Sequence, residues 1–136
     1  PVNAAVFAAA VADWRVEDAS NNKLKKSKRG DLPVLGLIEN LDILATVSKM
    51  KDGRPDLVVG FAAETDNVID HAIAKRLRKG CDWIVANDVS PETGIMGGLE
   101  NDVTLIHKDG FEDWPRMCKQ AVADRLVAKI AEVIGD

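Results

Sequence analysis

Short apolar runs separated by polar turns recur along the chain, the pattern of buried strands in an α/β protein. The first run, Val2–Ala10, is rich in alanine, and periodicity alone fits a buried strand or a buried helix. We predict a strand because the residues that follow, Asp13–Asn22, become polar and irregular. Four further runs, bounded by turn-forming or charged residues, are predicted strands: Val34–Ile38, Leu57–Ala62, Trp83–Ala86 and Val103–His107.

The helix predicted between the strands Leu57–Ala62 and Trp83–Ala86 is the best-defined predicted element. It starts after Thr65 or Asp66 as the N-cap and runs to Lys79, and Gly80 takes the C′ position. Two buried strands joined by such a crossover pair parallel, with a right-handed connection. The apolar stripe of this helix is formed by Val68, Ile69, Ala72, Ile73 and Leu77.

Two further helices are predicted on either side of this unit. One follows Asn40 as a candidate N-cap and stops at Gly53, and the other closes the chain over about Met117–Ile134. Their apolar faces consist of Ile43, Leu44, Val47 and Met50 in the first helix and Val122, Leu126, Ile130 and Val133 in the second.

These elements predict one α/β domain over residues 1–136, a Rossmann-like three-layer sandwich with a largely parallel sheet. We expect an added antiparallel edge that is used for dimerisation. Neither a G-x-G-x-x-G nor a Walker motif follows any predicted strand. The phosphates of a nucleotide would therefore be held in another way, or the chain begins partway through a larger fold.

Composition narrows the class of ligand and the compartment. The formal charge of −4 argues against general nucleic-acid binding, and no apolar stretch is long enough to span a membrane. Two cysteines, Cys81 and Cys118, fit reduced thiols and hence the cytoplasm. The spacing of His, Cys and carboxylate residues predicts no metal site, and His71 and His107 are interpreted as structural.

The basic residues gather in two clusters, Lys23–Arg29 and Lys75–Lys79. In an acidic protein, such clusters fit a small polyanionic ligand better than a nucleic-acid duplex. The alternative is that both are solvated surface faces, which is the commoner explanation of a charge run. Lys75 and Lys79 share one helix face, where their mutual repulsion would be reversed by a polyphosphate.

Five segments, in this order, carry a resemblance to a known family: Ala8–Trp14, Glu39–Leu44, Val59–Thr65, Ala74–Lys79 and Val85–Ser90. With Lys23 following the first segment, they resemble phosphopantothenoylcysteine synthetase, including the synthetase part of bifunctional decarboxylase/synthetases. Leu41 stands where the family usually has Pro. The family's upstream Gly-rich strand–turn and asparagine-bearing segment do not precede Pro1, so we expect a C-terminal part of a larger synthetase domain.

The resemblance implies CTP-dependent ligation of 4′-phosphopantothenate and cysteine through an acyl-cytidylate, in coenzyme A biosynthesis. It implies Mg²⁺ carried with the nucleotide, no flavin in this portion, a homodimer, and a possible upstream fusion to a flavin-dependent decarboxylase. Trp114 and the Gly94–Gly98 loop are candidates near the dimer interface. Lys23 would be catalytic, Asn87 would bind substrate, and the nucleotide would contact Ala9, Ala10, Asp13, Lys23, Leu41, Asp42, Ile43, Leu44, Phe61, Lys75 and Lys79.

Each assignment has a structural alternative. Lys23 can be a solvated loop lysine, Asp13 a cap at the start of a loop, and Phe61 either a stacking partner for the base or a core side chain. For the whole chain, the alternatives are a non-catalytic nucleotide-binding or dimerisation module and, less favoured without the G-x-G-x-x-G motif, a dinucleotide-dependent oxidoreductase.

Overall fold

The computed structural model describes residues 1–8, 11–18 and 34–135. They fall into two compact units, one made of residues 1–8 and 43–135 and the other of the described residues between 9 and 42. Each unit is described by itself below. Among the described residues, no helix combines the length and the apolar character needed to cross a membrane.

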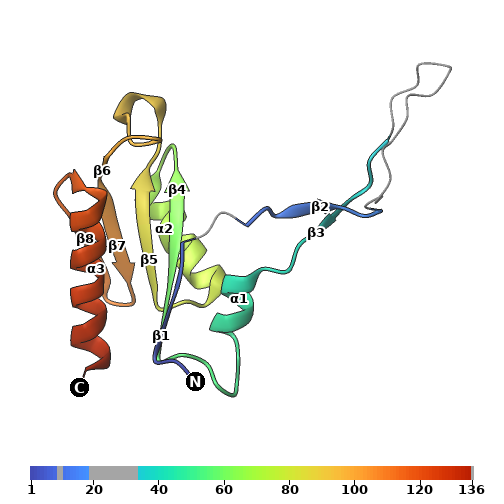
Figure 1. Ribbon diagram of the computed structural model, residues 1–136, viewed down its shortest axis with the longest axis horizontal. Helices are drawn as coiled ribbons and strands as arrows, with labels where there is room; N and C mark the ends of the chain where they lie inside the picture. The colour runs from blue at the N-terminus through green and yellow to red at the C-terminus, as the bar shows by residue number, and fades with distance from the viewer. Residues whose placement is uncertain (9–10, 19–33, 136) are drawn as a thin grey trace. The chain divides into compact units, whose positions relative to one another are not determined.

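The first unit is built on a five-stranded sheet (Figure 1). Its three parallel strands are followed by two antiparallel strands, so the predicted α/β class with a largely parallel sheet and an antiparallel edge is confirmed. In spatial order the strands are β1 (Ala4–Phe7), β4 (Leu57–Glu64), β5 (Trp83–Asp88), β7 (Val103–His107) and β8 (Gly110–Asp113).

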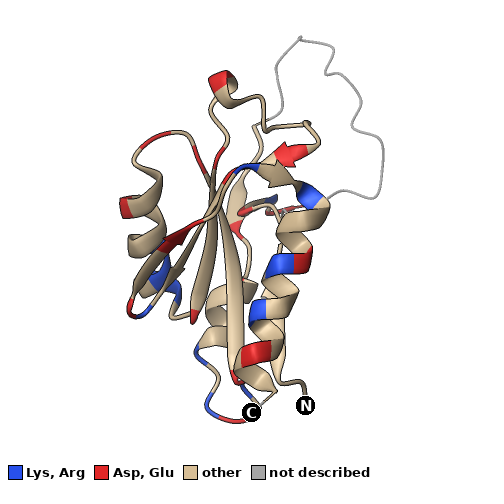
Figure 2. Ribbon diagram, turned by 90° about the vertical axis from the view of Figure 1, so that its left-hand side faces the viewer, with Lys and Arg blue, Asp and Glu red and all other residues tan. Residues whose placement is uncertain are grey.

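Helices cover both faces of this sheet. On one face lies α3 (Lys119–Ile134), and on the other lie α1 (Ile43–Ser48) and α2 (Val68–Lys79). Figure 2 shows the sheet between the two helical layers. The remaining elements of this unit are short: a 3₁₀ turn (Pro91–Thr93), β6 (Glu100–Asn101) and β9 (Met117–Cys118), of which the last two pair with each other.

Strand alternation divides the core between the two faces. Residues such as Val59 and Val85 pack with Leu126 of α3, whereas their neighbours Val58 and Ile84 pack with the α1–α2 layer. All four of these strand residues are fully buried. Because both faces are covered, β4 and β5 are continuous apolar runs instead of alternating ones, which is how the sequence revealed them.

Gly60 in the middle of β4 sets the distance between the sheet and α1. A Cβ atom at this position would lie 2.6 Å from Leu44 Cδ2 and 3.0 Å from Ile84 Cδ1. The missing side chain therefore lets Leu44 seat directly on the strand, and this contact holds the short helix α1 against the sheet.

A network of hydrogen bonds fixes the edge of the sheet where β4 and β5 begin. Asp82 Oδ2 accepts from Arg54 Nη2 at 2.8 Å and from the Val58 backbone N–H at 2.7 Å. Arg54 also donates from Nε to the Ser48 carbonyl at the end of α1. One half-exposed ion pair thus ties together α1, the loop after it and two strands.

The helix ends show where sequence patterns were correct and where they were wrong. Gly80 adopts φ 76° and its N–H bonds to the Arg76 carbonyl, which confirms the predicted end of α2. Its predicted N-cap is wrong, because α2 begins at Val68 and the residue before it, Asn67, has φ 42° and makes no capping side-chain bond. The Asn67 backbone carbonyl instead accepts a hydrogen bond from the His71 N–H in the first turn, at 3.0 Å.

The predicted apolar stripes hold only in part. In α2, Ala72 is fully buried but Leu77 is 69% exposed, so the inner face is narrower than the pattern indicates. The last helix buries Val122, Leu126 and Ile130 as predicted, but it starts at Lys119 and leaves Val133 exposed. Trp114, a candidate near the dimer interface, is 2% exposed and belongs to the core beneath Arg125, and its place near an interface stays a prediction.

The second unit is a two-stranded antiparallel ribbon of β2 (Trp14–Val16) and β3 (Leu37–Glu39). The predicted strand Val34–Ile38 is therefore misplaced, because its first three residues lie outside the ladder. Asn40 does not cap α1, which begins three residues later. Its side chain donates to the Ala12 carbonyl at 2.7 Å and accepts from Arg15 at 3.0 Å, closing the base of the ribbon.

Adding a side chain at Gly60 tests the close approach of α1. We expect Gly60→Ala to lower the free energy of unfolding by about 1–3 kcal/mol, because the new methyl group collides with Leu44. In Leu44→Ala the same substitution should cost less, since the colliding atoms are gone. Chemical denaturation of the two single variants and the double variant measures this coupling, and strictly additive effects would contradict the proposed contact.

The two free cysteines should differ sharply in reactivity. Cys81 is 3% exposed and burial raises the pKa of its thiol, so little thiolate forms and reagents reach it only after local opening. Cys118 is exposed. We expect iodoacetamide at pH 8 to label Cys118 at least about tenfold faster than Cys81, as measured by peptide mass spectrometry. Equal labelling rates in the folded protein would show that the described packing around Cys81 is wrong.

Candidate functional site

The parallel strands β4 and β5 end at one edge of the sheet, where open α/β proteins bind their ligands. Polar residues begin at this edge: Glu64 ends β4, and Asn87 and Asp88 end β5 (Figure 1). All three are half-buried. A ligand at this edge would thus meet carboxylate and amide groups held by backbone that is itself fixed in the sheet.

Hydrogen bonds hold the loop after β5 in one shape. Asp88 Oδ1 accepts from the Ser90 backbone N–H at 2.8 Å, and Thr93 Oγ1 donates to the Ser90 carbonyl at 2.8 Å. Hydrogen bonds from Ser90 lower the pKa of the Asp88 carboxyl, and the bond from its side chain has a larger effect than the bond from its backbone. Arg116 closes the loop from outside by donating to the Thr93 carbonyl at 3.2 Å. Asn87, the second-to-last residue of β5, is therefore followed by a preorganised turn.

A second group lies where α2 begins, and it includes a residue that the sequence analysis treated as structural. The Nδ1 atom of His71 lies 3.6 Å from Glu64 Oε2 and 3.9 Å from Asp66 Oδ1. Its side chain is 46% exposed, so it is accessible to a ligand. A polar residue directly after a buried strand, as at Glu64, is the signal that could have pointed to this group. Among the described residues, no set of three His, Cys, Asp or Glu side chains is arranged to hold a metal ion.

The predicted site residues of the first unit lie on two different faces of the sheet. Phe61 packs its ring against the core under α3. It pairs with Val85 of β5, and Asn87, two residues after Val85, lies on the same face of the sheet. This packing favours the core interpretation of the Phe61 ring. Leu44 lies on the opposite face, over Gly60, and its predicted neighbour Ile43 is 44% exposed.

Lys75 and Lys79 belong to α2, which covers the face opposite to Phe61. Both are half-buried and lie one turn apart near the C-terminal end of the helix, where cations are favoured by the helix dipole. Figure 2 shows basic residues gathering at that end. Within this unit, the two lysines therefore share a helical layer with Leu44, and the fold does not bring them to the ring of Phe61.

The other predicted site residues lie in the second unit or outside the described residues. Asp13 is exposed and its backbone carbonyl accepts from the Asn40 N–H at 2.8 Å, while Leu41 is 71% exposed and Asp42 half-buried. Ala9, Ala10 and Lys23 fall outside the described residues. Their assignment to the nucleotide stays a prediction.

Comparison with known proteins places the chain in a family. The model of the DNA/pantothenate metabolism flavoprotein C-terminal domain matches residues 1–134. The chain is 40% identical over 129 residues to the coenzyme A biosynthesis bifunctional protein CoaBC of Escherichia coli K12, covering 94% of this chain and 32% of that protein. The CoaBC protein of Haemophilus influenzae Rd is 44% identical over 124 residues, 91% of this chain and 30% of that protein.

A solved structure shares both the sequence pattern and the fold. The crystal structure of the C-terminal domain of CoaBC superposes with a TM-score of 0.71 at 33% identity, covering 99% of this chain and 56% of that one. The chain thus spans about a third of the length of the curated relatives that it matches. It belongs to the family of DNA/pantothenate metabolism flavoprotein C-terminal domains, which confirms the resemblance carried by its five ordered segments.

Proposed function

We propose that this chain serves coenzyme A biosynthesis as part of a phosphopantothenate–cysteine ligase that uses CTP. The observation that carries the proposal is the match over 94% of the chain to a bifunctional coenzyme A biosynthesis protein, within the domain that the family model describes. The carboxyl edge of β4 and β5, with its fixed polar turn, supports it as a place for a small ligand.

The proposed chemistry proceeds in two steps. A carboxylate is a poor acyl donor because its leaving group would be an oxide, so 4′-phosphopantothenate attacks the α-phosphate of CTP. This forms an acyl-cytidylate and releases pyrophosphate. The amine of cysteine then attacks the acyl carbon, forms the amide bond and displaces CMP. In such reactions the protein mainly positions the reactants and neutralises charge.

Cationic side chains supply that charge in the proposal. Lys23 closes on the triphosphate, and Lys75 and Lys79 add two ammonium groups from one helix face. Mg²⁺ comes with the nucleotide and is held mainly by phosphates and water, which needs no cluster of protein ligands. Asn87 serves the acyl substrate, because it is the amide side chain at the carboxyl end of β5, next to the fixed turn that follows the strand.

The nucleotide preference gives the first test. We expect CTP with Mg²⁺ to raise the melting temperature more than AMP or NAD does, by about 5–10 °C at a hundred times its Kd. Differential scanning fluorimetry of the whole chain measures it. Stabilisation by NADPH but not by CTP would replace the ligase proposal with the dinucleotide-dependent oxidoreductase.

Charge removal at Lys23 tests the proposed contact with the triphosphate. We expect Lys23→Ala to weaken CTP binding about tenfold to a hundredfold, the cost of one charged hydrogen bond. Lys108→Ala is the matched control, because Lys108 is an exposed lysine on the β7–β8 turn, at the other edge of the sheet. Equal CTP affinities of the two variants would remove Lys23 from the site.

We also propose that the chain forms a homodimer through the β2–β3 ribbon. On one face of the ribbon the register sets Trp14 beside Glu39 and Val16 beside Leu37. Trp14 and Leu37 are 59% and 57% exposed. A two-stranded ribbon is only marginally stable by itself, and its free edges pair readily with another strand. A second copy would cover the apolar face and extend the ribbon.

A charge on this face should weaken the dimer. We expect Leu37→Lys to raise the dimer dissociation constant at least about tenfold, because an ammonium would have to be buried in the interface. Leu99→Lys serves as the control, since Leu99 is 86% exposed in the first unit. Sedimentation equilibrium measures both, and a monomeric wild-type chain at high concentration would contradict the homodimer.

A further inference from the structure

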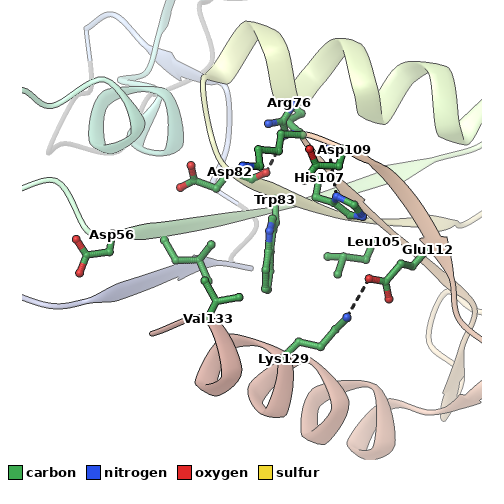
Figure 3. A pocket seen from close by; sticks show the side chains of 12 residues that line it. Asp56, Arg76, Asp82, Trp83, Leu105, His107, Asp109, Glu112, Lys129 and Val133 are labelled. Atoms are coloured by element: carbon green, nitrogen blue, oxygen red, sulfur yellow. Dashed lines mark hydrogen bonds and ion pairs between the residues drawn. The ribbon is translucent and has the colours of Figure 1, made fainter. Parts of the chain in front are cut away.

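A pocket of about 400 Å³ opens at the edge of the sheet where β4 and β5 begin (Figure 3). It lies between the sheet and the C-terminal half of α3, with Leu57 and Trp83 from the strand starts and Lys129 and Val133 from the helix. The parallel strands end at the opposite edge, so this pocket is separate from the site at Asn87. Its volume falls within the range of small-molecule sites.

The middle of the pocket is apolar and aromatic. The Trp83 indole is half-buried and projects among the lining side chains, as Figure 3 shows. Leu105, 1% exposed, and Leu57, 3% exposed, continue this surface. A flat ring fits such a surface, because an indole offers a large face for offset stacking and aliphatic side chains exclude water around it.

Two of the carboxylates around the pocket are already neutralised within the protein. The Asp82 carboxylate accepts hydrogen bonds from Arg54 at 2.8 Å and from the Val58 N–H at 2.7 Å. Glu112 forms an ion pair with Lys129 Nζ at 2.9 Å, and the bond from this lysine lowers the pKa of the Glu112 carboxyl. These groups therefore do not repel a negatively charged ligand strongly.

Of the described pocket cations, Arg76 and Lys108 lack such a partner; Lys108 is exposed and its charge is screened by water, whereas Arg76 is half-buried. Its Nε donates to the Asp82 backbone carbonyl at 2.8 Å, which holds the guanidinium at the pocket. Among the described residues, no carboxylate oxygen lies within ion-pair distance of it. His107 adds a second donor: its Nδ1 accepts from the Asp109 N–H, so the neutral ring carries its proton on Nε2.

Two further carboxylates, Asp56 and Asp109, also line the pocket. Both residues are exposed, so water and salt screen their charges. Arg76 is half-buried, and its field acts on a ligand with less screening. A planar guanidinium with free terminal nitrogens is suited to grip a carboxylate through two parallel hydrogen bonds.

We propose that this pocket binds a small aromatic carboxylate, with its ring against Trp83 and its carboxylate on Arg76. The site does not depend on the ligase proposal, because it shares no residue with the proposed nucleotide site. We assume a ligand of about 13 non-hydrogen atoms that gains about 0.3 kcal/mol of binding free energy per atom. The expected Kd is then about 1 mM.

Indole-3-acetate and indole-3-acetamide form a matched pair of probes, since they share the ring and differ in the charge. The readout is the indole N–H signals of Trp14, Trp83 and Trp114 in ¹H–¹⁵N spectra of the whole chain, assigned with single Trp→Phe variants. We expect indole-3-acetate to shift the Trp83 signal with a Kd of about 1 mM. The amide should bind about tenfold more weakly, because it loses the charged hydrogen bonds to Arg76.

Arg76→Gln should remove the preference for the carboxylate, leaving both probes with the weak affinity of the amide. Arg78→Gln is the matched control, because Arg78 lies on the same helix but not in the pocket. The spectra themselves report whether each variant is folded. The proposal is overturned if Trp83 does not shift at 10 mM probe, about ten times the expected Kd, if only Trp14 or Trp114 responds, or if both variants keep the wild-type preference.

Discussion

Burial of β4 and β5 on both faces is the constraint on which the rest of this structure depends. Val58 and Val59 are successive residues, yet both are fully buried, because one faces α2 and the other α3. Such a strand can carry no polar side chain along its middle without an internal partner. The same demand for contact on both faces explains Gly60, where Leu44 reaches the backbone itself.

The constraint confines the chemistry to the two ends of the strands. At the carboxyl ends, Glu64 and Asp88 begin the loops in which polar side chains and backbone are accessible. At the amino ends, Asp82 is used to tie Arg54 and β4 together, and it leaves Arg76 without a carboxylate. The two ends can therefore carry separate functions, since the apolar core between them transmits neither protons nor ligands.

The central elements could be predicted from sequence because local and tertiary requirements agree there. The apolar run from Leu57 and the glycine at position 80 each indicate one conformation, and the structure confirms both. The short strands were missed because they lack such runs: β8 contains exposed Phe111 beside charged residues, and β9 has two residues. The stripe of α2 was overestimated because periodicity gives the spacing of apolar residues, not the width of the surface that covers them.

The sequence indicated candidate site residues, but it did not indicate how the fold arranges them. Resemblance singled out Phe61 and Lys75 together, but strand alternation fixes the Phe61 ring in phase with Val59, facing α3, while Lys75 lies on the helix over the other face. The two positions therefore do not face each other across one side of the sheet. The pocket at Trp83 had no sequence signal, because its lining residues come from separate strands and helices and meet only once the sheet has formed.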